Sequence, residues 1–118
     1  GLNVSGVWDF QILPNQWTVS LDEAGIHPSL EKSFDQSIIT CKAKDTEKLA
    51  EIAAQITDGP VLSLQNGLGN HEILSRYVFE NSAVGVTTNA VKRISPGQIE
   101  WVGRGSIAVG GPTGEQFI

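Results

Sequence analysis

The sequence predicts an α/β fold in which parallel strands alternate with helices. Three short apolar runs, at residues 37–41, 61–64 and 82–88, have the composition of strands that are buried on both faces of a sheet. Two segments in which apolar residues recur at helical spacing separate these runs. The order strand, helix, strand, helix, strand is typical of right-handed parallel crossovers, which build the sheet of an α/β domain.

The N-terminal segment has a different pattern. Residues 2–21 are expected to form short extended pieces, because Gly6 and Pro14 interrupt any longer strand. Within this segment, residues 17–21 alternate between apolar and polar side chains as a strand does. Residues 25–30 are expected to connect this region to the first of the three apolar runs.

Each of the two helical segments has its own start signal and apolar face. Asp45 is placed to cap the first helix, and residues 58–60 (Asp-Gly-Pro) end it. The second helix is expected to begin near His71. The apolar faces consist of Leu49, Ile52, Ala53 and Ile56 in the first helix, and of Ile73, Leu74, Tyr77 and Val78 in the second.

The C-terminal part is predicted to be antiparallel. Residues 98–102 and 106–109 alternate as strands and are predicted to pair as a hairpin around the loop at residues 103–105. Pro96 and Gly97 form a turn before this hairpin. The closing strands are expected to lie at the edge of the parallel sheet.

Composition excludes several classes of function. The chain has 118 residues, which fits one domain or part of one. Its net charge is −5 and its eight Lys and Arg are dispersed along the sequence, so a nucleic-acid partner is not expected. No apolar run approaches the roughly 20 residues that span a bilayer, so no membrane partner is expected. Cys41 is the single cysteine, which with the absence of a signal peptide predicts a reducing, cytoplasmic setting. His27 and His71 lack neighbours at ligand spacing, so no metal site is expected.

The ends of the three predicted strands carry the candidate site. Open α/β sheets bind ligands beyond the carboxyl ends of their strands. Here those ends place Lys42, the amide and glycine of Asn66-Gly67, and Thr88 on one rim. A cation, an amide and a hydroxyl together suit a phosphate, a ribose or a carboxylate. Gly67 and Gly69 would allow close backbone approach to a ligand at a helix N-terminus.

Plainer readings of the same residues remain open at this point. The loop that starts at Asn66 has the residues of an ordinary strand-to-helix turn. Lys42 has the position of an ordinary solvated surface lysine. No G-x-G-x-x-G follows a first strand, so the turn that binds the diphosphate of a dinucleotide is missing from the sequence.

Four motifs in order resemble the ketopantoate reductases (2-dehydropantoate 2-reductases). They are FDQSIITCK at residues 34–42, VLSLQNGLGN at 61–70, VGVTTNA at 84–90 and the glycine-rich close at 97–110. The resemblance is close over residues 34–111 and faint over 1–33. It implies an NADPH-dependent reduction of ketopantoate to pantoate, a step toward pantothenate and coenzyme A.

The resemblance implies a partial domain. Residues 1–118 would form the second half of a Rossmann-like, doubly wound NADP-binding domain, without its first glycine-rich βαβ unit and without the C-terminal helical domain. The family's catalytic lysine and glutamate lie in that helical domain, so no catalytic residue is expected in this chain and the chain is expected to be inactive alone.

The resemblance also implies roles for individual residues. Lys42, Asn66, Gly67 and Thr88 are expected to bind NADPH, with Lys42 and Asn66 near its ribose and nicotinamide. Asn66 is also expected to lie close to the small 2-keto acid substrate. Many members of the family have a histidine where Asn89 stands, which leaves the identity of that keto acid open.

A different class of function remains an alternative. The same half-sheet would suit a stand-alone nucleotide-sensing or interaction module, which likewise needs no glycine-rich turn. The retained Lys42 and Asn66 at the strand ends favour the reductase, because a scaffold does not require them. An exposed edge of a half-sheet also favours self-association, so a homodimer is a further expectation.

Overall fold

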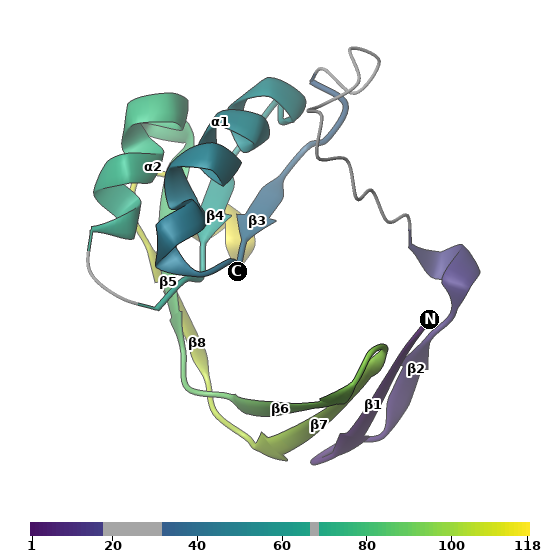
Figure 1. Cartoon of the computed structure of the whole chain (residues 1–118). Helices are drawn as coiled ribbons and strands as arrows, with labels where there is room; N and C mark the ends of the chain where they lie inside the picture. Colours follow the sequence, from purple (N-terminus) through teal and green to yellow (C-terminus); the bar gives the residue numbers. More distant parts are fainter. Residues whose placement is uncertain (18–31, 67–68) are drawn as a thin grey trace. The chain divides into compact units, whose positions relative to one another are not determined.

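The computed structural model describes residues 1–17, 32–66 and 69–118 (Figure 1). The chain divides into two compact units. The smaller unit comprises Gly1–Leu21 and Thr87–Ile107, and the larger unit comprises Asp22–Val86 and Ala108–Ile118.

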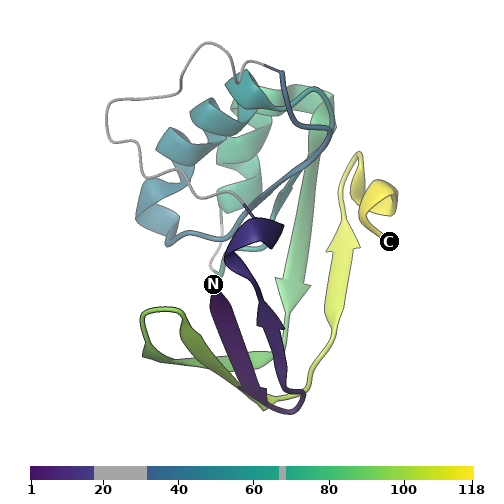
Figure 2. The same ribbon diagram turned by 90° about the vertical axis from the view of Figure 1, so that its right-hand side faces the viewer.

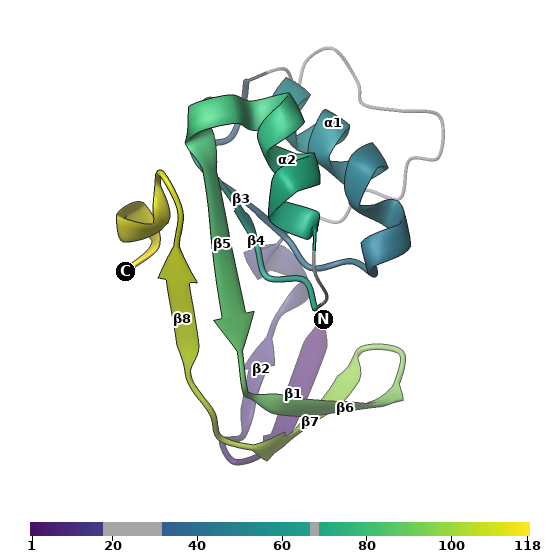
Figure 3. The same ribbon diagram turned by 90° about the vertical axis from the view of Figure 1, so that its left-hand side faces the viewer.

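The larger unit contains the predicted α/β sheet. Its strands lie in the order β3 (Ser37–Ile39), β4 (Val61–Ser63), β5 (Ser82–Thr87) and β8 (Ile107–Gly110). The pairs β3–β4 and β4–β5 are parallel, which confirms the predicted crossovers. Strand β8 runs beside β5 in the opposite direction (Figure 3).

Two helices make the crossovers, α1 (Thr46–Ile56) between β3 and β4, and α2 (Asn70–Val78) between β4 and β5. They lie side by side on one face of the sheet (Figures 1 and 3). Neither described helix is long and apolar enough to cross a bilayer.

The core of this unit lies between the sheet and the two helices. On α1 the buried residues are Thr46, Ala50 and Ala53, whose small side chains let the helix approach the strands and α2 closely. The buried face of α1 is therefore rotated from the predicted apolar face. Ala53 is buried, whereas Leu49, Ile52 and Ile56 are half-buried beside the edge of the sheet. The buried core cluster consists of Ile39, Ala50, Ala53, Val61, Leu74 and Val78.

Both ends of α1 are stabilised by side chains other than the one predicted. Asp45 occupies the N-cap position, but its side chain makes no capping hydrogen bond. That prediction was wrong because Ala43–Asp45 form a 3-10 turn, and the Thr46 hydroxyl bonds the Ala43 carbonyl oxygen at 2.8 Å. At the other end, the Lys32 ammonium donates to the Ala54 carbonyl oxygen at 2.7 Å, where a cation complements the helix dipole.

The smaller unit is a four-stranded sheet in the order β2 (Phe10–Ile12), β1 (Leu2–Gly6), β7 (Gln98–Gly103) and β6 (Ala90–Ser95). Strand β1 is antiparallel to β2 and parallel to β7, although most of the chain separates β1 from β7 (Figure 2). The short extended pieces predicted near the N-terminus are thus present as β1 and β2. Trp17 lies outside both strands, and the rest of the strand and the connection predicted there fall outside the described residues.

The predicted C-terminal hairpin was wrong in its partners. Strand β7 pairs with β6 across the Pro96-Gly97 turn, whereas β8 joins the other sheet next to β5. Gly97 has φ +76°, the left-handed conformation that a tight turn between antiparallel strands requires. Residues 104–106 are not a hairpin tip, because they connect β7 of one sheet to β8 of the other.

Candidate functional site

The C-terminal ends of β3 and β4 line a depression of about 340 Å³. Lys42, which follows β3, and Asn66, which follows β4, are both exposed at this depression. Two of the four residues predicted from the sequence are therefore together on one rim, as expected for neighbouring parallel strands. The lining consists of Thr40, Cys41, Lys42, Ala43, Leu64, Gln65 and Asn66.

Gln65 forms the buried floor of the depression. Its carboxamide nitrogen donates to the Thr46 hydroxyl oxygen at 2.8 Å and to the Cys41 carbonyl oxygen at 3.1 Å. Its carboxamide oxygen accepts from the Ser63 hydroxyl at 3.0 Å. Gln65 thereby connects the ends of β3 and β4 to the first residue of α1.

Asn70 extends this network to the second helix. Its carboxamide nitrogen donates to the carbonyl oxygen of Asn66 at 3.0 Å, and its oxygen lies 2.8 Å from the Thr46 hydroxyl. The Thr46 hydroxyl has one hydrogen, which the Asn70 oxygen shares with the Ala43 carbonyl oxygen. Within the described ranges, every buried side-chain nitrogen and oxygen has a hydrogen-bond partner. Sequence reasoning missed Thr46, Gln65 and Asn70, because a polar residue at a strand end or helix start usually faces solvent.

Cys41 borders the depression as a neutral thiol. Burial raises the pKa of Cys41 above its ordinary value, and the negative charge of Asp45 raises it further. Since the thiolate is the reactive form, the residue is poorly suited to act as a nucleophile at neutral pH.

Thr88 directly follows β5 and belongs to the smaller unit. Its backbone N–H donates to the Ser106 carbonyl oxygen at 2.9 Å, and its hydroxyl oxygen accepts from the Ser106 N–H at 2.9 Å. Its predicted role in cofactor binding stays a prediction. Gly67, the fourth predicted residue, lies outside the described residues.

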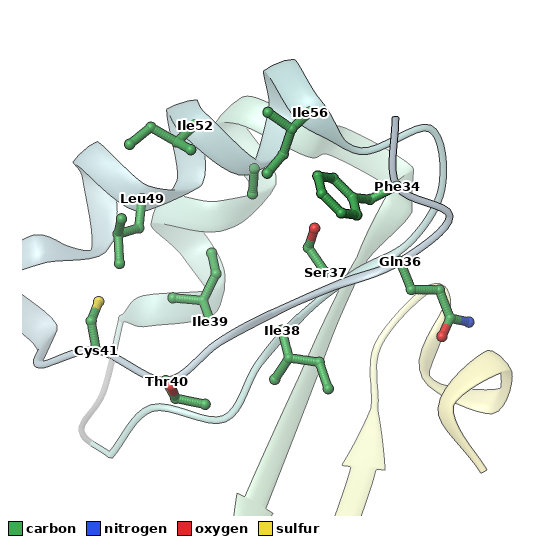
Figure 4. Close-up of a pocket in the computed structure, with 11 residues that line it drawn as sticks. Phe34, Gln36, Ser37, Ile38, Ile39, Thr40, Cys41, Leu49, Ile52 and Ile56 are labelled. Atoms are coloured by element: carbon green, nitrogen blue, oxygen red, sulfur yellow. The ribbon is translucent and has the colours of Figure 1, made fainter. Parts of the chain in front are cut away.

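A larger groove lies between β3 and α1 and has a volume of about 440 Å³ (Figure 4). Figure 4 shows Leu49 and Ile52 of the helix facing this groove, across from Ile39 of the strand. Strand β3 is an edge strand, and Ile38 on it is 55% exposed. The groove is mainly apolar and does not contain the charged and amide groups of the depression.

His71 and Ser82 form another polar contact in the larger unit. His71 Nε2 is 3.1 Å from the hydroxyl oxygen of Ser82. Ser82 is fully buried, so this hydroxyl is not accessible to a substrate. Among the described residues, no three His, Cys, Asp or Glu side chains are grouped closely enough to hold a metal ion.

Comparison with known proteins connects this geometry to one family. The sequence profile described as "Ketopantoate reductase PanE/ApbA" matches residues 1–114. The chain belongs to the ketopantoate reductase family. The match includes residues 1–33, where the motifs gave only a faint resemblance.

A curated member of the ketopantoate reductase family, 2-dehydropantoate 2-reductase from Archaeoglobus fulgidus, is 40% identical over 82 residues. This match covers 70% of the present chain but 28% of the relative, so the chain spans little more than a quarter of the relative's length.

Two solved structures have a similar fold. One is 2-dehydropantoate 2-reductase from Geobacter metallireducens, with a TM-score of 0.74 and 27% identity, covering 94% of this chain and 36% of that one. The other is D-mandelate dehydrogenase in complex with NADH, with a TM-score of 0.61 and 30% identity, covering 69% of this chain and 28% of that one. The α/β architecture of this chain is thus that of the ketopantoate reductases.

Proposed function

We propose that this chain is part of an NADPH-dependent reductase that converts ketopantoate to pantoate, and that it contributes to binding of the cofactor. The observation that carries the proposal is the position of Lys42 and Asn66 on one depression at the ends of neighbouring parallel strands. Relatives named 2-dehydropantoate 2-reductase support the reaction, and a similar structure in complex with NADH supports the class of cofactor.

The residues at the depression fit part of a nicotinamide dinucleotide. The ammonium of Lys42 suits an anionic or hydroxylated group, and the carboxamide of Asn66 offers both donors and an acceptor to a ribose or a carboxamide. A volume of about 340 Å³ is at the small end of the range for ligand pockets, which suits one portion of a dinucleotide rather than all of it. When bound, a reduced nicotinamide supplies the hydride.

Within this proposal, the chain's own residues bind and orient. Lys42 holds the cofactor through charge, and Asn66 holds both the cofactor and the 2-keto acid through hydrogen bonds. Thr88 and Gly67, the other two residues of the sequence-based prediction, are proposed to add contacts to the cofactor. Holding two reactants in a fixed geometry lowers the entropic part of the barrier. The lysine and glutamate that the resemblance assigns to catalysis belong to a helical domain outside residues 1–118.

The domain itself is proposed to be partial. Among the described residues no strand pairs with the outer edge of β3, and an apolar groove lies beside it; both support a sheet that continues past β3, because an exposed edge strand is normally paired or covered. A glycine-rich βαβ unit would supply both the missing strand and the diphosphate-binding turn. The 118-residue chain is therefore proposed to bind NADPH very weakly and to be inactive alone.

The experiment is a titration of the intact protein with NADPH and NADH, followed by assays of ketopantoate reduction from the absorbance of the reduced nicotinamide. We expect saturable binding, a preference for NADPH, and turnover only in the intact protein. Low-micromolar binding of NADPH by residues 1–118 alone would contradict the partial-domain proposal. Absence of binding and turnover in the intact protein would contradict the function.

Asn66→Ala in the intact protein tests the site itself. Loss of a buried hydrogen bond to a bound group costs about 1–3 kcal/mol, so kcat/KM should fall by roughly 5- to 150-fold. The matched control is Asn15→Ala, since Asn15 is exposed in the smaller unit. An unchanged kcat/KM in Asn66→Ala would remove this residue from the site.

A further inference from the structure

We propose that Gln65 and Thr46 are positioning residues, whose buried hydrogen bonds fix Lys42 and Asn66 relative to each other. The assignment of the ligand rests on the proposed function, but the positioning itself is a property of the hydrogen-bond network. Thr46 does not line the depression, and Gln65, which does, has its carboxamide engaged by Ser63, Cys41 and Thr46, so neither side chain is proposed to bind the ligand. Both act through the backbone of the residues that do.

Lys42 and Asn66, two of the residues that line the depression, need an external constraint. Lys42 and Asn66 are exposed and follow different strands, and β3 and β4 have ended before them. The backbone on each side is instead held by a carboxamide. Gln65 donates to the carbonyl oxygen of Cys41, which belongs to the peptide group that precedes Lys42. Asn70 donates to the carbonyl oxygen of Asn66 itself.

Thr46 joins these two contacts into one unit. Its hydroxyl accepts from the Gln65 carboxamide nitrogen at 2.8 Å and lies 2.8 Å from the Asn70 carboxamide oxygen. The path from Cys41 to Asn66 therefore runs through three side chains, and each carries a directional hydrogen bond. A shift of the backbone at Cys41 or at Asn66 would break at least one of these hydrogen bonds.

The orientation of Gln65 is also determined. Its oxygen accepts from the Ser63 hydroxyl at 3.0 Å, so a rotation of the carboxamide by half a turn would bring an N–H group against that hydroxyl and an oxygen against the Cys41 carbonyl. Only one of the two orientations satisfies the Cys41 carbonyl group.

The burial of these three side chains explains why their hydrogen bonds fix one geometry of the two strand ends. Thr46 is fully buried, and Gln65 and Asn70 are nearly so. Elsewhere the same helices contact the sheet through apolar residues such as Ala53 and Leu74. Polar groups in such a place are tolerated only when each has its partner, so they select one geometry among those that an apolar contact would permit.

Three variants of the intact protein separate hydrogen bonding from packing. Gln65→Met and Thr46→Val keep the approximate volume of the side chain and remove its hydrogen bonds. Thr46→Ser keeps the hydroxyl and removes a methyl group. Gln55→Met is the matched control, because Gln55 is an exposed glutamine on α1.

Two readouts apply to every variant. The first is the Kd for NADPH together with kcat and the KM for the cofactor. The second is amide hydrogen exchange at Asp45 and Ile73, whose N–H groups bond the carbonyl oxygens of Lys42 and Gly69 next to the network. The Thr57 amide, at the far end of α1, serves as the internal reference.

We expect Gln65→Met and Thr46→Val to weaken NADPH binding by about tenfold, the scale of one or two hydrogen bonds, with the change mainly in KM. Exchange at Asp45 and Ile73 should accelerate while exchange at Thr57 stays constant. Thr46→Ser should remain within about twofold of the natural protein in both readouts, and Gln55→Met should match it.

The proposal is overturned if Gln65→Met and Thr46→Val keep the natural Kd and exchange rates. It is also overturned if Thr46→Ser is as impaired as Thr46→Val, because packing of the methyl group would then explain the effect. Should the natural protein bind no nicotinamide dinucleotide, the proposed function fails, and the exchange rates alone decide whether the network positions the two loops. If Thr46→Val does not fold, the proposal is tested by the other two variants. It then requires that Gln65→Met be impaired in both readouts while Thr46→Ser stays close to the natural protein.

Discussion

The side-chain oxygen of Asn89 accepts a hydrogen bond from the backbone N–H of Gly105 at 2.9 Å. The same oxygen accepts from the indole nitrogen of Trp101 at 3.1 Å. The Asn89 carboxamide thereby connects the segment before β6 to β7 and to the loop that follows β7. This contact lies within the smaller unit and gives Asn89 a structural role that its place after two threonines did not indicate.

Replacing Asn89 tests this role. Asn89→Ala should lower the free energy of unfolding by about 0.5–1.5 kcal/mol, because the Gly105 N–H loses its acceptor and the Trp101 indole N–H keeps only the Gly103 carbonyl oxygen. Asn89→Asp, which keeps an acceptor oxygen, should cost less. Asn89→His should fall between them, since a neutral imidazole offers one acceptor nitrogen. Urea unfolding followed by tryptophan fluorescence measures all three, and equal stability of Asn89→Ala and the natural protein would show that the two contacts contribute nothing.

Gly105 is expected to be intolerant of any side chain. A Cβ atom there would meet the carbonyl group and the hydroxyl oxygen of Thr88 at less than a normal contact distance. Gly105→Ala should therefore destabilise the chain by about 1–3 kcal/mol, the usual cost of overpacking. Gly110→Ala is the matched control, because nothing lies within 4 Å of a Cβ at that position. If both variants shift the thermal midpoint equally, the close approach of residues 88 and 105 is not a constraint.

Lys42 and Lys44 form a natural pair for testing the depression. Both are exposed and lie two residues apart, but only Lys42 lines the depression. In the intact protein Lys42→Ala should weaken NADPH binding by about tenfold, on the order of one charge-assisted hydrogen bond, whereas Lys44→Ala should leave the Kd within about twofold. Calorimetric titration measures both. An equal loss in the two variants would point to general electrostatic attraction instead of a contact.

Alkylation of Cys41 should report its raised pKa. The residue is the single cysteine of the chain, and burial together with Asp45 disfavours its thiolate. Iodoacetamide should react at pH 8 more slowly than with an unstructured cysteine peptide, and the rate should continue to rise above pH 9. Asp45→Asn removes a negative charge, so the pKa of Cys41 should fall and the rate at pH 8 should increase, while burial keeps it below that of the peptide. A rate in the natural chain equal to that of the peptide would contradict the shift.

Local patterns were sufficient to predict the parallel sheet. Strands such as β4 are short, apolar and separated by helices with regular spacing, so their direction follows from crossover geometry. The placement of Lys42 and Asn66 on one rim was predictable for the same reason, since strand ends of a parallel sheet share one edge. Neither inference needs information about distant parts of the chain.

Distant pairing was not predictable from local pattern. Residues 98–103 have an alternating pattern that suits several partners, and the structure pairs them with β1 and β6 instead of β8. The roles of Thr46 and Gln65 were missed because a buried polar residue and an exposed one have the same sequence signature. Only the three-dimensional arrangement of their partners distinguishes the two cases.

Strands β5 and β8 are neighbours in one sheet, although residues 88–106 separate them along the chain. The chain thus leaves the larger sheet and returns to an adjacent position in it. Such a geometry permits the intervening segment to be lengthened, shortened or exchanged for another sequence while the register of the larger sheet is kept. New sequence should therefore be grafted inside this excursion and away from its two ends, where Thr88 and Ser106 hydrogen-bond each other.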